Sequence, residues 1–213
     1  MRIVVLRHAL KRFFSVNIDI FLRTCCLIAV TVWFTRAGAS QGTVILAVNT
    51  LLMQFFILFS YFMDGFAFAG EAMCGNCLGA NDSDRLRESV RSLLGWGLAM
   101  AVSFTAIYFI AGEWIMRLLS EDSNVITASR EYFDWVLLIP LSGFLAFTWD
   151  GVFIGITRTR EMLMSMAFAT LTYFILYFSL YPIMGNHGLW IAFLSYLLSR
   201  GIVLHILYRI NSR

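Results

Sequence analysis

The sequence has little charge. Only 14% of its 213 residues are Asp, Glu, Lys or Arg, whereas 60% are hydrophobic and the mean hydropathy is +0.77. An ordinary soluble domain carries about 25% charged residues. A soluble core this apolar would have no polar surface, so the composition excludes a soluble globular domain. The net charge of +3 is explained by membrane orientation, and we expect no nucleic-acid partner.

Signatures of enzymes are also missing. The sequence contains no Ser-His-Asp order, no glycine-rich phosphate-binding loop and no nucleotide motif, which argues against an enzyme and against an ATP-driven pump within this chain. Cys74 and Cys77 have a Cys-x-x-Cys spacing. Zinc normally takes four ligands, however, and no second cysteine pair or histidine pair lies nearby in the sequence. We therefore expect no metal and no cofactor.

Long apolar runs take the place of these motifs. About 20 helical residues, each rising about 1.5 Å, cross a hydrocarbon core of about 30 Å. Residues 162–199 contain no charge and are too long for one span, so we divide them at Pro182 and the Gly185-Asn186-His187-Gly188 segment. The pattern predicts an all-α polytopic membrane protein, a single six-helix unit over residues 1–213 with spans at about 13–34, 44–78, 92–112, 132–156, 162–184 and 189–208.

The distribution of basic residues predicts that both termini are cytoplasmic. Cytoplasmic loops of membrane proteins carry an excess of Lys and Arg. With six spans and both ends inside, the outside segments hold only Arg36, Arg117 and Arg130. The inside segments hold Arg2, Arg7, Lys11, Arg12, Arg85, Arg87, Arg91, Arg158, Arg160, Arg209 and Arg213. An odd number of spans would destroy this asymmetry.

Two aspartates lie deep in apolar sequence with a similar local pattern. Asp64 and Asp150 each follow an aromatic-rich run and precede a glycine. Carboxylates are costly in hydrocarbon and are usually retained there to handle ions, protons or substrate. We expect both to act in transport. For Asp150 the alternative is a carboxyl group neutralised by a hydrogen bond between helices. Beside it, Gly143, Gly151 and Gly155 form an edge of small residues that another helix can approach closely.

Glu71 and Arg23 are two further candidates. Asp64 and Glu71 are seven residues apart, so both project from one face of the second predicted span and could relay protons or attract cationic compounds. The alternative for Glu71 is a solvated position near the headgroups. Arg23 lies one helical turn after Asp19 in the first span, and a simple pair between these two is as plausible as a direct role.

Four segments resemble the C-terminal half of DinF-like transporters of the multidrug and toxic compound extrusion (MATE) family. They are residues 17–24 (NIDIFLRT), 64–72 (DGFAFAGEA), 150–158 (DGVFIGITR) and 185–190 (GNHGLW). Members of this family have two six-helix lobes related by a pseudo-twofold axis and export organic, often cationic, compounds in exchange for protons or sodium ions. The resemblance implies that this chain is the second lobe, surrounded by lipid in the cytoplasmic membrane of a bacterium. The first lobe would come from a longer protein, a partner or a second copy.

The resemblance also implies roles for individual residues. Asp150 matches an acidic cation-site residue in the tenth helix of NorM-like relatives. Arg23 falls where those relatives have a glutamate that assists sodium binding, and a cation there opposes a bound cation. Proton coupling is therefore expected rather than sodium coupling. In DinF-like members the proton-coupling carboxylate lies in the other lobe, which this sequence does not include.

Three functions remain open from the sequence. The first is a lobe of a secondary antiporter that exports organic cations. The second is a flippase for lipid-linked saccharides, which has a related architecture; such flippases line their cavity with arginines, and within the predicted spans only Arg23 and Arg200 are basic. The third is a non-transporting partner or a truncated remnant of a transporter.

Overall fold

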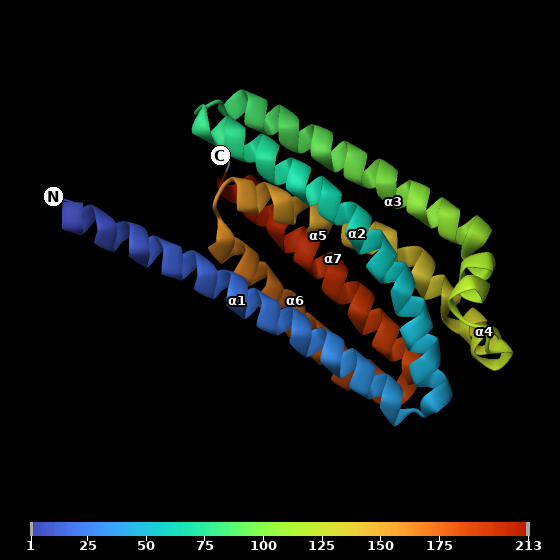
Figure 1. Cartoon of the computed structure of the whole chain (residues 1–213). Helices are drawn as coiled ribbons and strands as arrows, with labels where there is room; N and C mark the ends of the chain where they lie inside the picture. Colours follow the sequence, from blue (N-terminus) through green and yellow to red (C-terminus); the bar gives the residue numbers. More distant parts are fainter. Residues whose placement is uncertain (1, 212–213) are drawn as a thin grey trace.

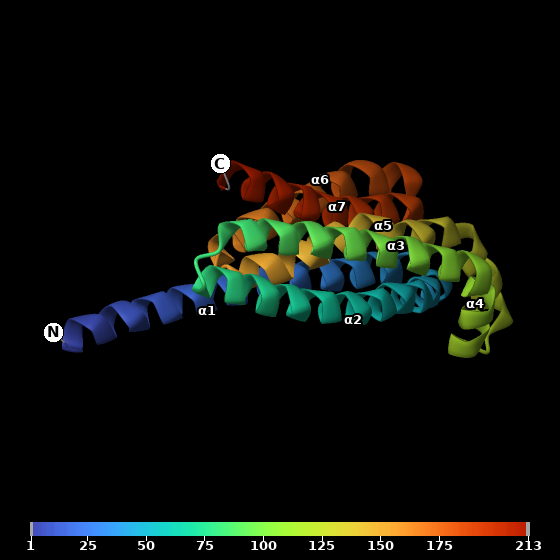
Figure 2. The same ribbon diagram turned by 90° about the horizontal axis from the view of Figure 1, so that it is seen from above.

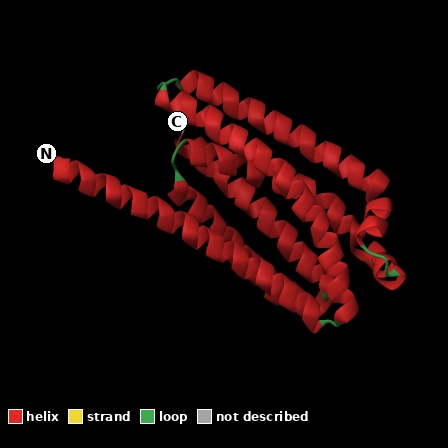
Figure 3. Cartoon of the chain, in the orientation of Figure 1, coloured by secondary structure: helices red, strands yellow, loops and turns green. Residues whose placement is uncertain are grey.

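The computed structural model describes the backbone of residues 2–211 and the side chains of residues 17–210. The described part is helical throughout and contains no strand (Figure 3). Its elements are α1 (Arg2–Ser40), α2 (Thr43–Gly79), α3 (Ser83–Leu119), α4 (Ser123–Ser129), the 3-10 helix η1 (Arg130–Tyr132), α5 (Phe133–Gly155), α6 (Thr159–Met184) and α7 (Asn186–Asn211).

Six stretches are long and apolar enough to cross a membrane. They are α1 from Asn17 onward, α2, α3, the continuous run of α4 to α5, α6 and α7. The prediction of an all-α membrane protein with six spans is thus confirmed. Helix α3 is longer than the span that we predicted over residues 92–112. Charged residues did not end this helix, because Asp82 caps its start by accepting a hydrogen bond from the Arg85 N–H at 2.9 Å, and Arg117 bonds to Glu113 at 2.7 Å within it.

The break between α6 and α7 is shorter than the sequence suggests. Pro182 lies inside α6, and Gly185 alone separates the two helices, with a positive φ of 54°. Residues with side chains rarely adopt this conformation, whereas glycine adopts it freely. His187 and Gly188, which we expected in the loop, already belong to α7.

The centre of the bundle is formed by α5 and α7. Helix α5 packs against α2, α3 and α7, while α6 packs against α7 and α1. Figure 1 shows α1 and α2 meeting at their turn and diverging from there, and α2 curves along its length. Consecutive helices α1 and α2 therefore contact each other mainly near that turn, and the outer flank of α1 is left without a helix beside it (Figure 2).

Helices α2 and α5 touch through their backbones. A Cβ atom added to Gly151 would lie 2.1 Å from the carbonyl oxygen of Ala67, and one added to Gly155 would lie 2.6 Å from that of Glu71. Only glycine allows this approach. The predicted small-residue edge beside Asp150 is confirmed, and the helix that uses it is α2.

The connections alternate between the two ends of the bundle. The two termini, the α2–α3 turn and the α5–α6 turn lie at one end in Figure 1, which we call the basic end. Among the described side chains it carries Arg85, Arg87, Arg91, Arg158, Arg160 and Arg209. The opposite end, with the α1–α2 turn and α4, carries Arg36, Arg117 and Arg130. The grouping of basic residues at one end follows directly from the alternating helices.

Candidate functional site

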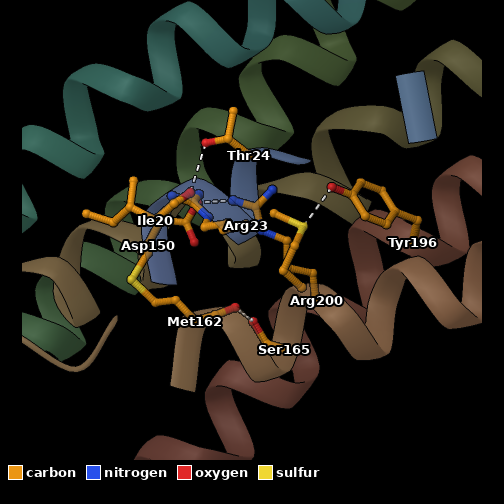
Figure 4. A network of polar contacts seen from close by, with 9 residues as sticks. Ile20, Arg23, Thr24, Asp150, Met162, Ser165, Tyr196 and Arg200 are labelled. Carbon is orange, nitrogen blue, oxygen red and sulfur yellow. Dashed lines mark hydrogen bonds and ion pairs between the residues drawn. The ribbon is translucent and has the colours of Figure 1, made fainter. Parts of the chain in front are cut away.

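Asp150 is buried between three helices. Its side chain lies in the middle of the bundle on α5, and the residue is only 6% exposed. One carboxylate oxygen, Oδ2, accepts a hydrogen bond from Nη2 of Arg23 on α1 and from Nη2 of Arg200 on α7 (Figure 4). A single oxygen atom of Asp150 therefore joins three helices. Arg23 lies 127 positions from Asp150 in the sequence, and Arg200 lies 50 positions from it.

The surroundings make this buried charge tolerable. A carboxylate taken out of water must be paired and hydrogen-bonded, or it destabilises the fold. Arg200 is itself only 4% exposed, and its guanidinium carbon lies 5.7 Å from the centre of the Phe147 ring, one turn before Asp150. Gly201 lets α7 approach α5 closely, since a Cβ atom there would lie 2.8 Å from the backbone nitrogen of Ala146. Packing of α7 on α5 thus sets the position of Arg200.

One carboxylate oxygen has no partner. Asp150 Oδ1 is buried and forms no hydrogen bond with any described residue. Both guanidinium groups contact Oδ2 instead. An unpaired acceptor in a buried site is the atom at which a proton or a water molecule can bind without displacing an existing contact.

The interpretation of Arg23 as a partner of Asp19 is wrong. Arg23 reaches across to Asp150, and Asp19 Oδ2 instead accepts a hydrogen bond from Thr159 Oγ1 on α6 at 3.2 Å. The reason lies in tertiary packing. Helix α1 lies along α6, so Asp19 meets a hydroxyl group there, whereas the buried carboxylate of Asp150 offers Arg23 a less hydrated and therefore stronger partner.

Asp64 lies near the same cluster but is not locked into it. The residue is half-buried on α2 and forms no hydrogen bond or ion pair with any described residue. Arg200 and Arg23 are nevertheless close enough to act on its charge. Two aspartates and two arginines from four helices are therefore brought together, and of the two carboxylates Asp64 is the more accessible.

Glu71 lies outside this cluster. It is half-buried on α2 and forms no hydrogen bond or ion pair with a described residue. Its backbone, rather than its side chain, makes the contact with Gly155 on α5. Glu71 is two helical turns nearer to the basic end than Asp64, so the two carboxylates line up on one face of α2.

Sequence reasoning missed Arg200 and Tyr196 as site residues. Tyr196 lies one turn before Arg200 on α7, is 1% exposed, and donates a hydrogen bond to Met166 Sδ at 3.0 Å. A signal for Arg200 was present: buried aspartates need cationic partners, and Arg23 and Arg200 are the basic residues inside the predicted spans.

A cavity opens between α1 and α2 in the half of the bundle opposite the basic end. It measures about 270 Å³. Its wall combines hydroxyl and amide groups with aromatic and aliphatic side chains, contributed by Thr31, Phe34, Thr35, Leu46, Asn49, Thr50, Met53, Gln54, Phe56 and Ile57. A neighbouring cavity of about 590 Å³ shares Thr50 and Gln54 and continues to Asp122. Mostly apolar walls with a few polar groups are typical of small-molecule sites.

A buried amide pair forms the back of that cavity. Asn49 on α2 and Asn186 on α7 exchange two side-chain hydrogen bonds, at 2.7 and 2.9 Å, and Trp190 Nε1 donates to Asn49 Oδ1 at 3.1 Å. Both asparagines are 2% exposed. The pair ties the ends of two helices that are distant in sequence, and so it fixes the shape of the cavity.

Cysteine chemistry does not contribute to the site. Cys74 and Cys77 are buried and form no disulfide. Within residues 17–210 no three His, Cys, Asp or Glu side chains gather in a way that could hold a metal ion. The two cysteines lie instead among packed side chains near the α2–α3 turn, where Cys77 Sγ is 3.8 Å from Ser89 Oγ.

Comparison with known proteins identifies relatives over most of the chain. The family model described as MatE matches residues 17–178. The chain is 35% identical over 203 residues to DNA damage-inducible protein F of Escherichia coli (strain K12), covering 95% of this chain and 44% of the relative. It is 23% identical to the chloroplastic protein DETOXIFICATION 44 of Arabidopsis thaliana, over 79% of this chain and 32% of the relative.

Solved structures show the same fold. A MATE protein in the bent conformation superposes with a TM-score of 0.78 at 14% identity, over 91% of this chain and 44% of that protein. The outward-facing form of a multidrug resistance MATE family transporter of the MOP superfamily gives a TM-score of 0.78 at 15% identity, over 93% of this chain and 45% of that protein. The chain thus spans less than half the length of the proteins that it matches.

Proposed function

Because the chain belongs to the MATE family, whose family model matches residues 17–178, we propose that it forms one lobe of a secondary active transporter that exports organic cations in exchange for protons. Since it spans 44% of its E. coli relative, a second six-helix lobe is needed to close the transport path. That lobe is either the remainder of a longer protein or another polypeptide, a second copy of this chain included.

The observation that supports this function is the buried cluster around Asp150. One carboxylate is held by arginines from α1 and α7, with a second carboxylate, Asp64, within electrostatic reach. Charged groups at this depth in a membrane protein are costly and mark ion or substrate pathways.

The need for ligands favours protons over sodium ions. Any cation bound at Asp150 would face two guanidinium groups, and like charges at about 4 Å repel one another by about 4 kcal/mol even at an effective dielectric constant of about 20. This repulsion acts on a proton as well as on a sodium ion. A proton, however, binds directly to one carboxylate oxygen and needs no coordination shell, whereas a sodium ion needs several oxygen ligands beside a carboxylate that two arginines already contact.

Competition between a proton and a cationic substrate follows from the charge balance. With Asp64 and Asp150 ionised, the two aspartates and two arginines sum to zero. Protonation of Asp64 leaves one excess positive charge, which repels a bound organic cation; loss of that proton removes the repulsion. In this mechanism Asp150 positions the arginines, Asp64 exchanges the proton, and Glu71 extends the line of negative charge toward the basic end.

The arginines argue against the flippase alternative. A lipid-linked saccharide carries phosphate groups, which need unpaired positive charge in the cavity wall. Arg23 and Arg200 both bind Asp150. Their charge is already used inside the protein, so a cationic substrate fits the cluster better.

We further propose that the basic end faces the cytoplasm of a bacterial cell. The protein is an integral membrane protein with six spans, and the excess of arginines at the basic end follows the rule that Lys and Arg stay on the cytoplasmic side. Reporter fusions at the α2–α3 turn and at the α1–α2 turn test this orientation. Cytoplasmic reporter activity at the α1–α2 turn would contradict it.

Drug efflux from bacteria that lack their own pumps, and that express this lobe joined to the N-terminal lobe of its E. coli relative, tests the function. Replacement of Asp64 or Asp150 by Asn should reduce efflux of a cationic dye to the level of cells without the protein. Asp134→Asn is the matched control, since Asp134 is an exposed aspartate on the same helix as Asp150. In proteoliposomes an imposed pH gradient should drive dye movement and a sodium gradient should not. Unchanged efflux in the Asp64 and Asp150 variants, at equal amounts of protein, would reject the mechanism.

A further inference from the structure

A third cavity lies at the basic end of the bundle, about two helical turns beyond Asp150, since Ile156 at the end of α5 is part of its wall. It measures about 270 Å³ and is bounded by the α2–α3 turn, the α5–α6 turn and the last turns of α7. Its polar side chains are Arg87, Arg158, Tyr208 and Ser83. Nothing in the proposed transport mechanism uses these residues, so the cavity raises the question of what it binds.

The polar side chains line one cavity although they come from three different parts of the chain. Arg87 lies on α3, Arg158 in the α5–α6 turn and Tyr208 near the end of α7. The Tyr208 ring is held in place by Trp149, which is fully buried, with 4.7 Å between ring centres. Ser83, the first residue of α3, adds a hydroxyl group to the wall. The cavity therefore offers an anion donors from two guanidinium groups and two hydroxyl groups.

Arg87 and Arg158 each have an acidic neighbour in the protein but keep guanidinium nitrogens that can bind a ligand. Arg87 contacts Asp84 through Nη1 at 3.7 Å, and Arg158 contacts Glu161 through Nε at 4.0 Å. Both distances are at the long end for ion pairs, and the Asp84 side chain is 92% exposed. The exposed Arg87–Asp84 pair contributes little to stability. Within residues 17–210 the remaining guanidinium nitrogens of both arginines have no acidic partner, and a planar guanidinium group can bind phosphate through two nitrogens at once.

The rest of the wall is apolar and suits a lipid rather than a free ion. Leu78, Leu86 and Ile156 complete the cavity beside the polar groups. Leu78 is exposed, as expected for a side chain that contacts acyl chains. The position is also appropriate, since the turns between membrane spans lie at the depth of the headgroups. Basic pockets between transmembrane helices on the cytoplasmic side are typical binding sites for anionic lipid headgroups.

We infer that this cavity binds one anionic phospholipid of the leaflet at the basic end, with its phosphate between Arg87, Arg158 and the Tyr208 hydroxyl and its acyl chain along Leu78 and Ile156. The lipid would link the α2–α3 turn to the α5–α6 turn and to the end of α7. It would thereby stabilise the end of the bundle where the α2–α3 hairpin has few other contacts with α7.

Lipid-dependent stabilisation of the complete membrane protein tests this inference. We expect phosphatidylglycerol added to the detergent-purified protein to raise Tm more than phosphatidylcholine does, and native mass spectrometry to show one retained phosphatidylglycerol. The Arg87→Gln, Arg158→Gln double variant should lose both effects. The matched control is Arg91→Gln with Arg160→Gln, which removes the same charge from the same two elements at exposed positions outside the cavity.

Several results would overturn the inference. These are a double variant that still retains phosphatidylglycerol, a control variant that loses it to the same extent, or inorganic phosphate alone giving the same rise in Tm as the lipid. If the double variant does not accumulate in the membrane, Tyr208→Phe replaces it, since this change keeps the ring on Trp149 and removes only the hydroxyl. Weaker lipid retention by Tyr208→Phe supports the site, and unchanged retention contradicts it.

Discussion

Helices α1 and α5 are joined by the Arg23–Asp150 pair, yet they are held in the bundle in different ways. In the most apolar 18-residue window of each span, 61% of residues are buried in the span that contains α5, but only 11% in α1. Among the described residues of α1, the buried ones are Val30, Phe34, Ala37 and Gly38, and all lie in the half nearer its turn to α2. From residue 17 to 29 no side chain of α1 is buried.

Residues 17–29 of α1, nearer the basic end, are therefore held by polar contacts more than by a core. These contacts include the Asp19 bond to Thr159 and the Arg23 pair with Asp150. Helix α5, in contrast, is fixed by close packing on α2, α3 and α7. A charge change in the cluster should therefore weaken the attachment of α1 more than that of α5, as expected in the proton-driven cycle that we propose. The apolar flank of α1 is left for lipid or for a second lobe.

The largest expected effect is the loss of the α2–α5 contact. Gly151→Ala places a methyl group about where the backbone of Ala67 already lies, and backbone atoms cannot move aside as a flexible side chain can. We expect a destabilisation of about 3 kcal/mol or more, measured by thermal unfolding in detergent. Gly65→Ala on α2 is the control, since a Cβ atom there meets nothing within 4 Å. Equal stability of both variants would mean that α2 and α5 do not pack through their backbones.

The next prediction compares the loss of stability when either of the two arginines that bind Asp150 is replaced. Arg200→Gln removes a buried partner, with side-chain exposure of 5%, and leaves Asp150 paired with Arg23 alone. It should cost about 3 kcal/mol, the lower end of the range for breaking a buried ion pair. Arg23→Gln removes a partner that is 23% exposed and should cost less, while hydrogen exchange increases in residues 17–29 of α1. A larger loss of stability for Arg23→Gln would contradict the view that α5 and α7 form the fixed core.

A smaller effect is expected at the amide pair that ties α2 to α7. Asn49→Ala leaves buried donors and acceptors of Asn186 and Trp190 unpaired, which should cost about 1–3 kcal/mol in thermal unfolding. Thr50→Ala is the neighbouring control, because the Thr50 hydroxyl bonds only to the Leu46 carbonyl in its own helix. If both changes have the same effect, the amide pair does not hold the two helices together.

The smallest expected effect concerns the end of α1 that adjoins its turn to α2. The Tyr181 hydroxyl on α6 donates to the Ala37 carbonyl at 3.0 Å and lies 2.8 Å from Ser40 Oγ. Side-chain hydrogen bonds between membrane helices contribute about 0.6 kcal/mol on average, so Tyr181→Phe should lower stability by about that amount. Tyr61→Phe, at a residue that is 71% exposed, should leave the unfolding temperature unchanged. If Tyr61→Phe lowers the unfolding temperature as much as Tyr181→Phe does, the Tyr181 hydrogen bonds do not hold α1 to α6.

Much of the fold could be predicted from local patterns. The start of α2 and the ends of α5 and α6 fall within about a residue of their expected positions, because apolar length alone sets where a helix can cross a membrane. The ends of α3 could not be predicted in this way. Capping by Asp82 and the Glu113–Arg117 bond carry that helix beyond the apolar run, and such contacts depend on side-chain geometry at the helix ends.

The sequence by itself determined that the chain is a six-span membrane protein with carboxylates at 64 and 150 inside it, because hydrophobic length and the cost of buried charge are properties of a single segment. It also determined the glycine edge on which α2 packs. Only the tertiary structure decided that Arg23 binds Asp150 instead of Asp19, and that Arg200 joins them. The physical reason is distance: an ion pair forms wherever packing brings two charges together out of water, and neither of these arginines is near Asp150 in the sequence.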